Sequence, residues 1–271
     1  MMNCKQILFI LLTLFSISCF AQQDSNVAFI KSIPGNYSYF TADNLNNLYL
    51  VDNNNRLKKL NSNGDSVGVF NEVKKHGMLS SIDVSNPLKI VLYYKNYSTI
   101  VILDRFLNVR NTINLRKKNL FKVSAVCTSY DNNIWLFDEV DAKLKKIGDD
   151  GETIAETIDM RIVLDSVPSP SMIKDQDGFV YLYDSTKGFY TFDYYGGFKN
   201  RMQFLHWKDA DVFGKTFLGI TDNILYQYTT GSMELKQYML PTSKKQVQQS
   251  KIAGNKFYVL NEDGIEIYEI K

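Results

Sequence analysis

Short apolar runs alternate with polar turn residues along most of this chain. In the stretch NNLYLVDNNNRLKKLNSNGD (Asn46–Asp65), the run LYLV is followed by a DNNN turn, a second run and an Asn-Gly turn. The stretch NNIWLFDEVDAKLKKIGDDGE (Asn132–Glu152) repeats this order. Such runs, bounded by Asn, Asp and Gly, are typical of β-strands joined by tight turns. No convincing helical period interrupts the pattern, so the sequence predicts an all-β protein.

The repeat becomes regular when the chain is aligned on an apolar pair followed three residues later by a polar residue. Six copies result, with the pairs Leu48-Tyr49, Val91-Leu92, Ile134-Trp135, Val180-Tyr181, Phe217-Leu218 and Phe257-Tyr258. The second members of successive pairs are 43, 43, 46, 37 and 40 residues apart, and the second and fifth copies are degenerate. A period of about 42 residues is that of a four-stranded propeller blade. The sequence therefore predicts a six-bladed β-propeller of four-stranded antiparallel blades.

The two ends of the repeat array predict how the ring closes. The last copy ends one strand short, whereas the segment AFIKSI (Ala28–Ile33) precedes the first copy without a blade of its own. An unpaired strand edge invites aggregation. We therefore predict that this N-terminal segment is the outer strand of the last blade.

The first residues have the layout of a secretory signal peptide. Lys5 is followed by the apolar run Ile7–Ile17 and by small residues that end at Ala21. The run is far shorter than the roughly 20 residues that span a bilayer, which disfavours a retained anchor. Lipidation of Cys19 is also disfavoured, because Ser16 stands where a lipoprotein signal usually has Leu. We expect cleavage of residues 1–21 and a periplasmic or outer-membrane-associated product.

The remaining chain, residues 22–271, is expected to form a single, monomeric propeller domain. It has one cysteine, Cys127, and so no internal disulfide, which leaves the apolar core to hold the fold. Its 30 basic and 29 acidic residues give no electrostatic reason to expect a nucleic acid or an anionic membrane as partner. No other stretch approaches the length of a membrane span.

Acidic residues follow the second predicted strand of most copies. They are Asp52, Asp138, Asp184, Asp222, and Glu262 with Asp263, whereas Lys95 stands in the second copy. In propellers this loop commonly contributes to a binding face, so these residues are candidates for one. A ring of carboxylates could hold Ca²⁺, which takes six to eight oxygen ligands. The favoured interpretation is that each side chain caps its own turn, so we expect no cofactor.

Two further groups are candidates for binding. His206-Trp207, in LHWKDAD, could line a pocket, but a packing pair is the favoured interpretation, since a lone histidine without a partner makes no catalytic argument. The segment LRKKNLFK is the densest basic cluster and the candidate patch for an acidic partner, through Arg116, Lys117, Lys118 and Lys122. The other lysine pairs, Lys58-Lys59 and Lys145-Lys146 among them, are expected to face water on outer strands.

Sequence motifs of enzymes are missing. KDQDGFVY lacks the Ser and the Trp of a sialidase Asp box, and the chain has no nucleophile elbow, P-loop or dinucleotide fingerprint. With two histidines in the chain, a zinc site built on several histidines is out of reach. A non-catalytic binding protein is therefore the favoured function. The alternative is a small divalent-metal-dependent hydrolase or lyase of lactonase type that uses the acidic loops.

The repeat resembles the six-bladed propellers of the NHL and TolB types, in its N-N-[LI]-[YW]-L-x-D stretch, its [RK]-L-K-K-[LI] strand and its Gly turn. The segment SIDVSNPLKIVLYYKNYSTIVILDRFLNVRNTINL (Ser81–Leu115) looks like one found in exported propellers of Bacteroidetes-type bacteria. Some of those proteins are accessory or plug subunits of the type IX secretion translocon. The resemblance implies an envelope protein as partner, such as an outer-membrane translocon. The second and fifth copies, which depart most from the repeat, are where we expect a distinctive binding surface.

Overall fold

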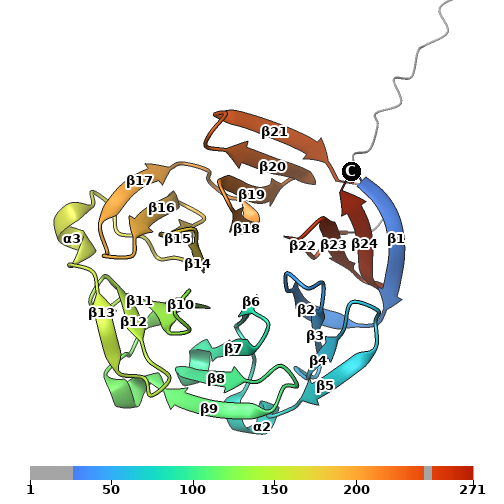
Figure 1. Cartoon of the computed structure of the whole chain (residues 1–271), viewed down its shortest axis with the longest axis horizontal. Coiled ribbons are helices and arrows are strands. Elements are labelled where there is room, and N and C mark those ends of the chain that lie inside the picture. Colours follow the sequence, from blue (N-terminus) through green and yellow to red (C-terminus); the bar gives the residue numbers. More distant parts are fainter. Residues whose placement is uncertain (1–26, 241–245, 271) are drawn as a thin grey trace, which may run out of the picture.

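The computed structural model describes residues 27–240 and 246–270, and these form a ring of six blades around a common axis (Figure 1). Each blade is a four-stranded antiparallel sheet, which confirms the predicted propeller. Residues 1–21, including Cys19, lie outside the described residues. Within the described ranges, no helix is long and apolar enough to cross a membrane.

The first three blades, from the inner to the outer strand, follow one another directly in the chain. Blade I contains β2 (Tyr37–Ala42), β3 (Leu48–Asp52), β4 (Leu57–Leu60) and β5 (Ser66–Phe70). Blade II contains β6 (Ser81–Asn86), β7 (Lys89–Tyr94), β8 (Thr99–Leu103) and β9 (Val109–Asn114). Blade III contains β10 (Val123–Thr128), β11 (Ile134–Asp138), β12 (Lys143–Ile147) and β13 (Thr153–Glu156).

The second half of the ring has the same plan. Blade IV contains β14 (Met172–Gln176), β15 (Phe179–Asp184), β16 (Gly188–Asp193) and β17 (Phe198–Met202). Blade V contains β18 (Lys208–Phe213), β19 (Thr216–Thr221), β20 (Ile224–Thr229) and β21 (Glu234–Met239). Blade VI contains β22 (Gln249–Ala253), β23 (Lys256–Asn261), β24 (Gly264–Ile270) and, outermost, β1 (Val27–Pro34).

The ring closes as the surplus N-terminal segment predicts. Strand β1 pairs antiparallel with β24 over its whole length, from Val27 opposite Ile270 to Pro34 opposite Gly264. Figure 1 shows β1 and β24 side by side in this blade. Because the first and last strands share one sheet, the ring cannot open without breaking their hydrogen-bonded ladder.

The core consists of six separate apolar layers, one between each pair of neighbouring blades. Between blades III and IV, for example, Trp135 and Phe137 pack against Val180 and Leu182. Between blades VI and I, Tyr258 and Leu260 pack with residues of β2 and β3. Bulky, stiff side chains fill the space between the sheets, which explains the 17 Tyr and 17 Phe of the chain.

The repeat alignment is correct for five blades and slips by one residue in blade II. Trp135 lies between its own blade and the next blade, whereas Leu92 faces back towards blade I. The residue of blade II that faces forward is Val91. Successive side chains of a strand point to opposite faces, so a slip of one residue reverses the face. After Lys89, the run IVLYY has no Asn, Asp or Gly that could fix the register.

The degenerate fifth copy contains a hairpin, and the expectation that the lysine pairs face water on outer strands is wrong. The run DVFGKTFLGI is a hairpin, because Gly214 (φ 56°) turns the chain between β18 and β19. The lysines of RLKKL and KLKKI lie on the third strand of their blades, and Lys59, Lys145 and Lys146 are buried. Lys59 Nζ donates to the carbonyl oxygen of Arg105 (2.9 Å), so its charge is satisfied inside the fold.

The two faces of the ring carry different connections. The top face, as we use the term, carries the loops between the second and third strands of each blade and the connections from each outer strand to the next inner strand. The bottom face carries the remaining turns. The helical segments are single turns on the top face, namely α2 (Val73–His76), η1 (Lys95–Tyr97), η2 (Leu115–Lys118) and α3 (Met160–Val163).

Candidate functional site

The top face brings together all the loops that carry the predicted binding residues. In three blades, the loop between the second and third strands is hydrogen-bonded to the connection that leaves the same blade. The amide of Leu115 donates to the carbonyl oxygen of Ser98 (2.8 Å), and the amide of His206 donates to the carbonyl oxygen of Ser185 (2.7 Å). The amide of Gly35 donates to the carbonyl oxygen of Asp263 (3.0 Å). These bonds hold each loop against the chain segment beside it on the top face.

The carboxylate of Asp52 is occupied by its own turn. Its Oδ1 accepts from the amides of Asn54 (2.9 Å) and Arg56 (3.0 Å), and its Oδ2 pairs with the Arg56 guanidinium (2.7 Å). Burial would raise the pKa of Asp52, but the hydrogen bonds and the positive charge of Arg56 lower it overall. These contacts are those of a capped turn.

Asp138 is a buried member of an ion pair. Lys145 Nζ lies 2.8 Å from Asp138 Oδ2, and Lys145 also contacts the carboxylate of Asp141. Burial alone would lower the pKa of Lys145, but these two carboxylates raise it overall. Asp138 is therefore directed towards the interior of blade III.

Asp184 joins two loops of the top face. Its Oδ2 accepts from the amide of Ser169 (2.8 Å), and its Oδ1 accepts from the amide and hydroxyl of Thr186 (2.8 and 2.7 Å). These donors lower the pKa of Asp184 against the effect of its burial. The side chain fixes the entry to β14.

The acidic residues of blades V and VI lie in tight two-residue turns. Asp222 (φ 51°) and Asn223 (φ 62°) both adopt the left-handed conformation of a hairpin turn. The amide of Asp263 donates to Asn261 Oδ1 (3.0 Å) in the corresponding turn of blade VI. Among residues 27–240 and 246–270, no group of three or more His, Cys, Asp or Glu side chains is arranged to hold a metal ion.

His206 and Trp207 have different environments. His206 is exposed and has a left-handed backbone (φ 60°), whereas Trp207 is buried. The indole stacks on Phe204 with ring centroids 4.5 Å apart. The Trp207 amide donates to the Tyr183 hydroxyl (2.7 Å), and that hydroxyl lies 3.1 Å from the Trp207 carbonyl oxygen. Trp207 is thus a packing residue between blades IV and V.

The basic segment of the top face divides into paired and unpaired charges. Lys118 Nζ lies 2.5 Å from Glu152 Oε1, and Lys122 Nζ lies 2.8 Å from Glu139 Oε2. No described carboxylate lies within ion-pair distance of Lys95, Arg116 or Lys117. Arg116 Nε instead donates to Ser98 Oγ (3.2 Å). These three exposed residues give the top face of blade II an unbalanced positive charge.

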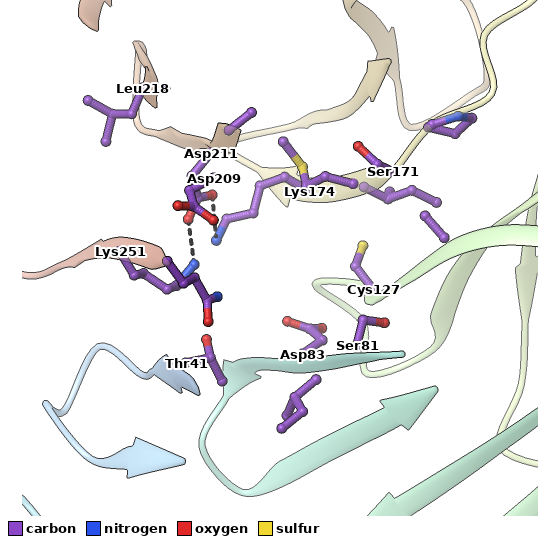
Figure 2. Close-up of a pocket in the computed structure, with 18 of the residues that line it drawn as sticks. Thr41, Ser81, Asp83, Cys127, Ser171, Lys174, Asp209, Asp211, Leu218 and Lys251 are labelled. Atoms are coloured by element: carbon purple, nitrogen blue, oxygen red, sulfur yellow. Dashed lines mark hydrogen bonds and ion pairs between the residues drawn. The ribbon is translucent and has the colours of Figure 1, made fainter. Parts of the chain in front are cut away.

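Lys95 also lies at the mouth of the axial channel, a cavity of about 500 Å³ that is lined by the inner strands of all six blades. One structurally equivalent residue from each blade lines it at the level drawn in Figure 2. In five blades this residue lies opposite the aligned position of the second strand, and in blade II it lies opposite Val91. We call these residues the channel ring: Thr41, Asp83, Cys127, Lys174, Asp211 and Lys251, from blades I to VI in order.

The charges of the channel ring are unevenly distributed. Asp211 in blade V lies between two lysines, with its Oδ2 2.8 Å from Lys251 Nζ and its Oδ1 3.5 Å from Lys174 Nζ (Figure 2). Burial would raise the pKa of Asp211, but the two ammonium groups hold it well below its usual range. Asp83 lies in blade II, opposite blade V in the ring, and no described basic group pairs with it.

Other polar groups surround the channel ring. Asp83 Oδ1 accepts from the amide (3.0 Å) and hydroxyl (2.6 Å) of Ser85, and Asp209 Oδ2 accepts from the amide (2.8 Å) and hydroxyl (3.0 Å) of Ser250. Burial raises the pKa of Asp209. Ser124 Oγ is buried in the channel wall and has no hydrogen-bond partner.

The sequence-based analysis missed the charged residues of the channel. Asp209 and Asp211 both accept hydrogen bonds from blade VI, from Ser250 and Lys251, although β18 has a bulge between Lys208 and Asp211. Two aspartates so close together in one strand were the signal from which a charged channel wall could have been predicted. The fifth copy of the repeat is degenerate, so the run KDADVF was not recognised as an inner strand.

A smaller cavity of about 350 Å³ opens on the bottom face beside blades II to IV. Tyr130 and Tyr194 stack there with ring centroids 4.4 Å apart. Lys146 Nζ lies 5.0 Å from the centroid of the Tyr130 ring and 2.9 Å from Asp131 Oδ2. This arrangement buries the ammonium group of Lys146 between aromatic rings and a carboxylate.

No family model matches the chain, and no curated protein is similar to it in sequence. Solved structures share its fold. A catalytically inactive histidine-to-alanine variant of virginiamycin B lyase from Staphylococcus aureus, with quinupristin, is 15% identical with a TM-score of 0.56, over 90% of this chain and 88% of that one. The Pan2 WD40 domain of Neurospora crassa is 10% identical with a TM-score of 0.63, and the match covers 91% of this chain and 96% of that domain.

The structure of PorZ, an essential surface component of the type IX secretion system of Porphyromonas gingivalis, is also similar. It is 12% identical with a TM-score of 0.56, over 87% of this chain but 31% of PorZ. At these identities the likeness shows the fold alone. The similar structures include lyases as well as WD40 domains, so the fold is compatible with binding and with catalysis. What these comparisons establish for the chain is a six-bladed β-propeller.

Proposed function

We propose that this protein is a non-catalytic binding component of the cell envelope, which docks another envelope protein on its top face. The observation that carries the proposal is a set of exposed apolar side chains on neighbouring loops of that face, together with unpaired basic residues. The expected signal peptide, residues 1–21, supports an envelope location. Interfaces are typically apolar at the centre and polar at the rim, and this surface has that composition.

The apolar part of the surface comes from neighbouring loops. Its five residues are each more than half exposed, namely Met78, Tyr97, Phe121, Val140 and Ile162. The Tyr97 ring lies against Gly77, next to Met78 in the chain, since a Cβ on Gly77 would lie 2.6 Å from that ring. Scattered apolar residues are normal on a surface, but a group of them on one face marks an interaction site.

The charge of the same surface specifies the chemistry of the partner. The ion pair between Lys122 and Glu139 (2.8 Å) neutralises one end of the basic segment. Lys95, Arg116 and Lys117 keep their charge uncompensated beside Tyr97. An acidic loop that also carries apolar side chains complements this surface, and such complementarity accelerates association and selects the partner.

The finer proposal is that the partner belongs to an outer-membrane secretion machine, for which this protein is an accessory or plug subunit. It is supported by the resemblance of residues 81–115 to exported propellers and by the propeller fold of PorZ, a surface component of such a machine. A catalytic role has less support, since neither of the two histidines, His76 and His206, lines the channel.

Charge reversal tests the docking surface. We expect Lys95→Glu combined with Arg116→Glu and Lys117→Glu to reduce co-purification of the envelope partner by at least about tenfold, and moderate salt to do the same to the unmodified protein. The matched control reverses three exposed, unpaired charges away from the top face, at Lys58, Arg110 and Lys215. Equal recovery with both triple variants would overturn the proposal.

A further inference from the structure

The channel ring presents both kinds of charge at one level of the cavity. Lys174 and Lys251 lie in blades IV and VI, on either side of Asp211 in blade V. Asp83 faces them from blade II (Figure 2). The ring therefore has two ammonium groups and two carboxylates, and the cavity has a positive side and a negative side.

The positive side has unused hydrogen-bonding capacity. An ammonium group has three donors. Lys251 Nζ and Lys174 Nζ each contact a single described carboxylate, that of Asp211, at 2.8 and 3.5 Å. Because two ammonium groups share one carboxylate within ion-pair distance, both keep free donors on this side of the channel. A second carboxylate, supplied by a ligand, would complete their coordination.

The negative side lacks a cation. Asp83 accepts hydrogen bonds from Ser85 (2.6 and 3.0 Å) and from the amide of Thr128, which orient its carboxylate without neutralising it. Asp209 lies beside Asp211 in blade V and accepts from Ser250 through one of its two oxygens, so it does not belong to this side. An ammonium group beside Asp83 would supply the missing positive charge.

We propose that the axial channel binds a small zwitterion, an α-amino acid or a short peptide, whose carboxylate meets Lys174 and Lys251 and whose ammonium group meets Asp83. A cavity of about 500 Å³ is of the size that holds such a molecule. The serine and threonine hydroxyls of the wall provide further polar contacts, and Ser124 Oγ is a buried hydroxyl still without a partner. The site does not use the residues of the docking proposal, so the two proposals fail independently.

The test uses the full propeller and a panel of defined probes. Free amino acids and glycyl dipeptides are screened by ligand-observed NMR at about 1 mM, and those that bind are titrated by calorimetry. We expect N-acetylation or C-terminal amidation of the same probe to weaken binding by at least about tenfold each, since either change removes one charge. Three outcomes would overturn the proposal. They are equal binding of the blocked and unblocked probes, binding of acetate or methylamine in place of the zwitterions, and no binding by any probe.

Variants locate the site. We expect Lys251→Met and Asp83→Asn each to abolish binding, while Lys251→Arg retains part of it, and the exposed-residue controls Lys58→Met and Asp65→Asn leave it unchanged. If the charge variants unfold, Ser171→Tyr narrows the channel without removing a charge, and we expect it to block binding in a protein of unaltered melting temperature. A folded variant of this kind that binds like the original protein would place the zwitterion elsewhere and contradict the assignment.

Discussion

Gln249 on the inner strand of blade VI bridges to Phe40 on the inner strand of blade I through two hydrogen bonds. Gln249 Oε1 accepts from the Phe40 amide (3.0 Å), and Gln249 Nε2 donates to the Phe40 carbonyl oxygen (3.1 Å). The two residues are 209 positions apart in the chain. One side chain thus ties the last blade to the first at the axis, while β1 ties them at the rim.

Loss of this bridge is expected to loosen the ring. Gln249→Leu leaves two buried main-chain groups of Phe40 without partners, which costs about 1–3 kcal/mol in free energy of unfolding. The matched control is Gln248→Leu, at a neighbouring exposed position without side-chain hydrogen bonds. Urea denaturation of both variants measures the difference, and equal midpoints would show that the bridge contributes nothing.

Loss of one partner of the buried ion pair in blade III is expected to destabilise the protein, because the other charge stays buried without a counter-charge. Lys145→Met leaves the buried carboxylate of Asp138 without its cation, which costs about 3–5 kcal/mol. Adding Asp138→Asn removes the unpaired charge and is expected to restore most of the stability. Thermal unfolding of the single and double variants checks this, and a double variant no more stable than Lys145→Met would count against it.

Gly219 is expected to tolerate no side chain. A Cβ at this position would lie 2.4 Å from the indole of Trp207, which is held by stacking on Phe204. We predict that Gly219→Ala destabilises the protein by about 1–3 kcal/mol. Gly231→Ala, where a Cβ meets nothing within 4 Å, is the control. Similar melting temperatures for the two variants would contradict the packing role of Trp207.

The pair of Asp131 and Lys146 predicts a loss of stability in acid. Burial would raise the pKa of Asp131, but the hydrogen bond from Lys146 and those from Asn133 and Ser129 lower it to about 2. Because the folded-state pKa is lower than that of the unfolded chain, the stabilisation is complete above about pH 4 and is lost as the pH falls towards 2. Solvent screening limits it to about 1 kcal/mol.

NMR titration of the Asp131 carboxyl group measures this pKa directly. In the Lys146→Met variant we expect the pKa of Asp131 to rise towards the usual value for an aspartate. The acid midpoint of unfolding is then expected to shift to higher pH. An unchanged Asp131 titration in that variant would show that Lys146 is not the cause.

Local chemistry explains which features the sequence predicted. Asx and Gly residues encode the turns, for example those after Leu50-Val51 and Phe137-Asp138. The apolar pairs that precede such turns recur with one period, and this period predicted the six blades and the closure of the ring. Blade II was misaligned because no Asn, Asp or Gly follows Lys89 within the run IVLYY to mark the end of the strand. Lys145 was wrongly expected to face water. Its pairing with Asp138 and Asp141 depends on the conformation of the loop before β12, which the sequence pattern does not reveal.

The candidate sites were predictable in part. The loops of Asp52, Asp138 and Asp184 do share the top face, but their carboxylates are engaged by neighbouring donors that no spacing identifies. The channel ring was missed because its members lie on six different blades. Only the three-dimensional ring brings Asp83 and Lys251 to the same cavity.

The central claim, that the top face docks an acidic envelope protein, is tested most directly by site-specific photo-crosslinking in the native cell. A photoreactive phenylalanine analogue replaces Tyr97 or Phe121 on the top face, or Tyr195, which is 97% exposed in a bottom-face turn. We predict one discrete adduct of higher mass from Tyr97 and Phe121, and none from Tyr195. Adducts from Tyr195 alone, or none from any of the three positions, would contradict the claim.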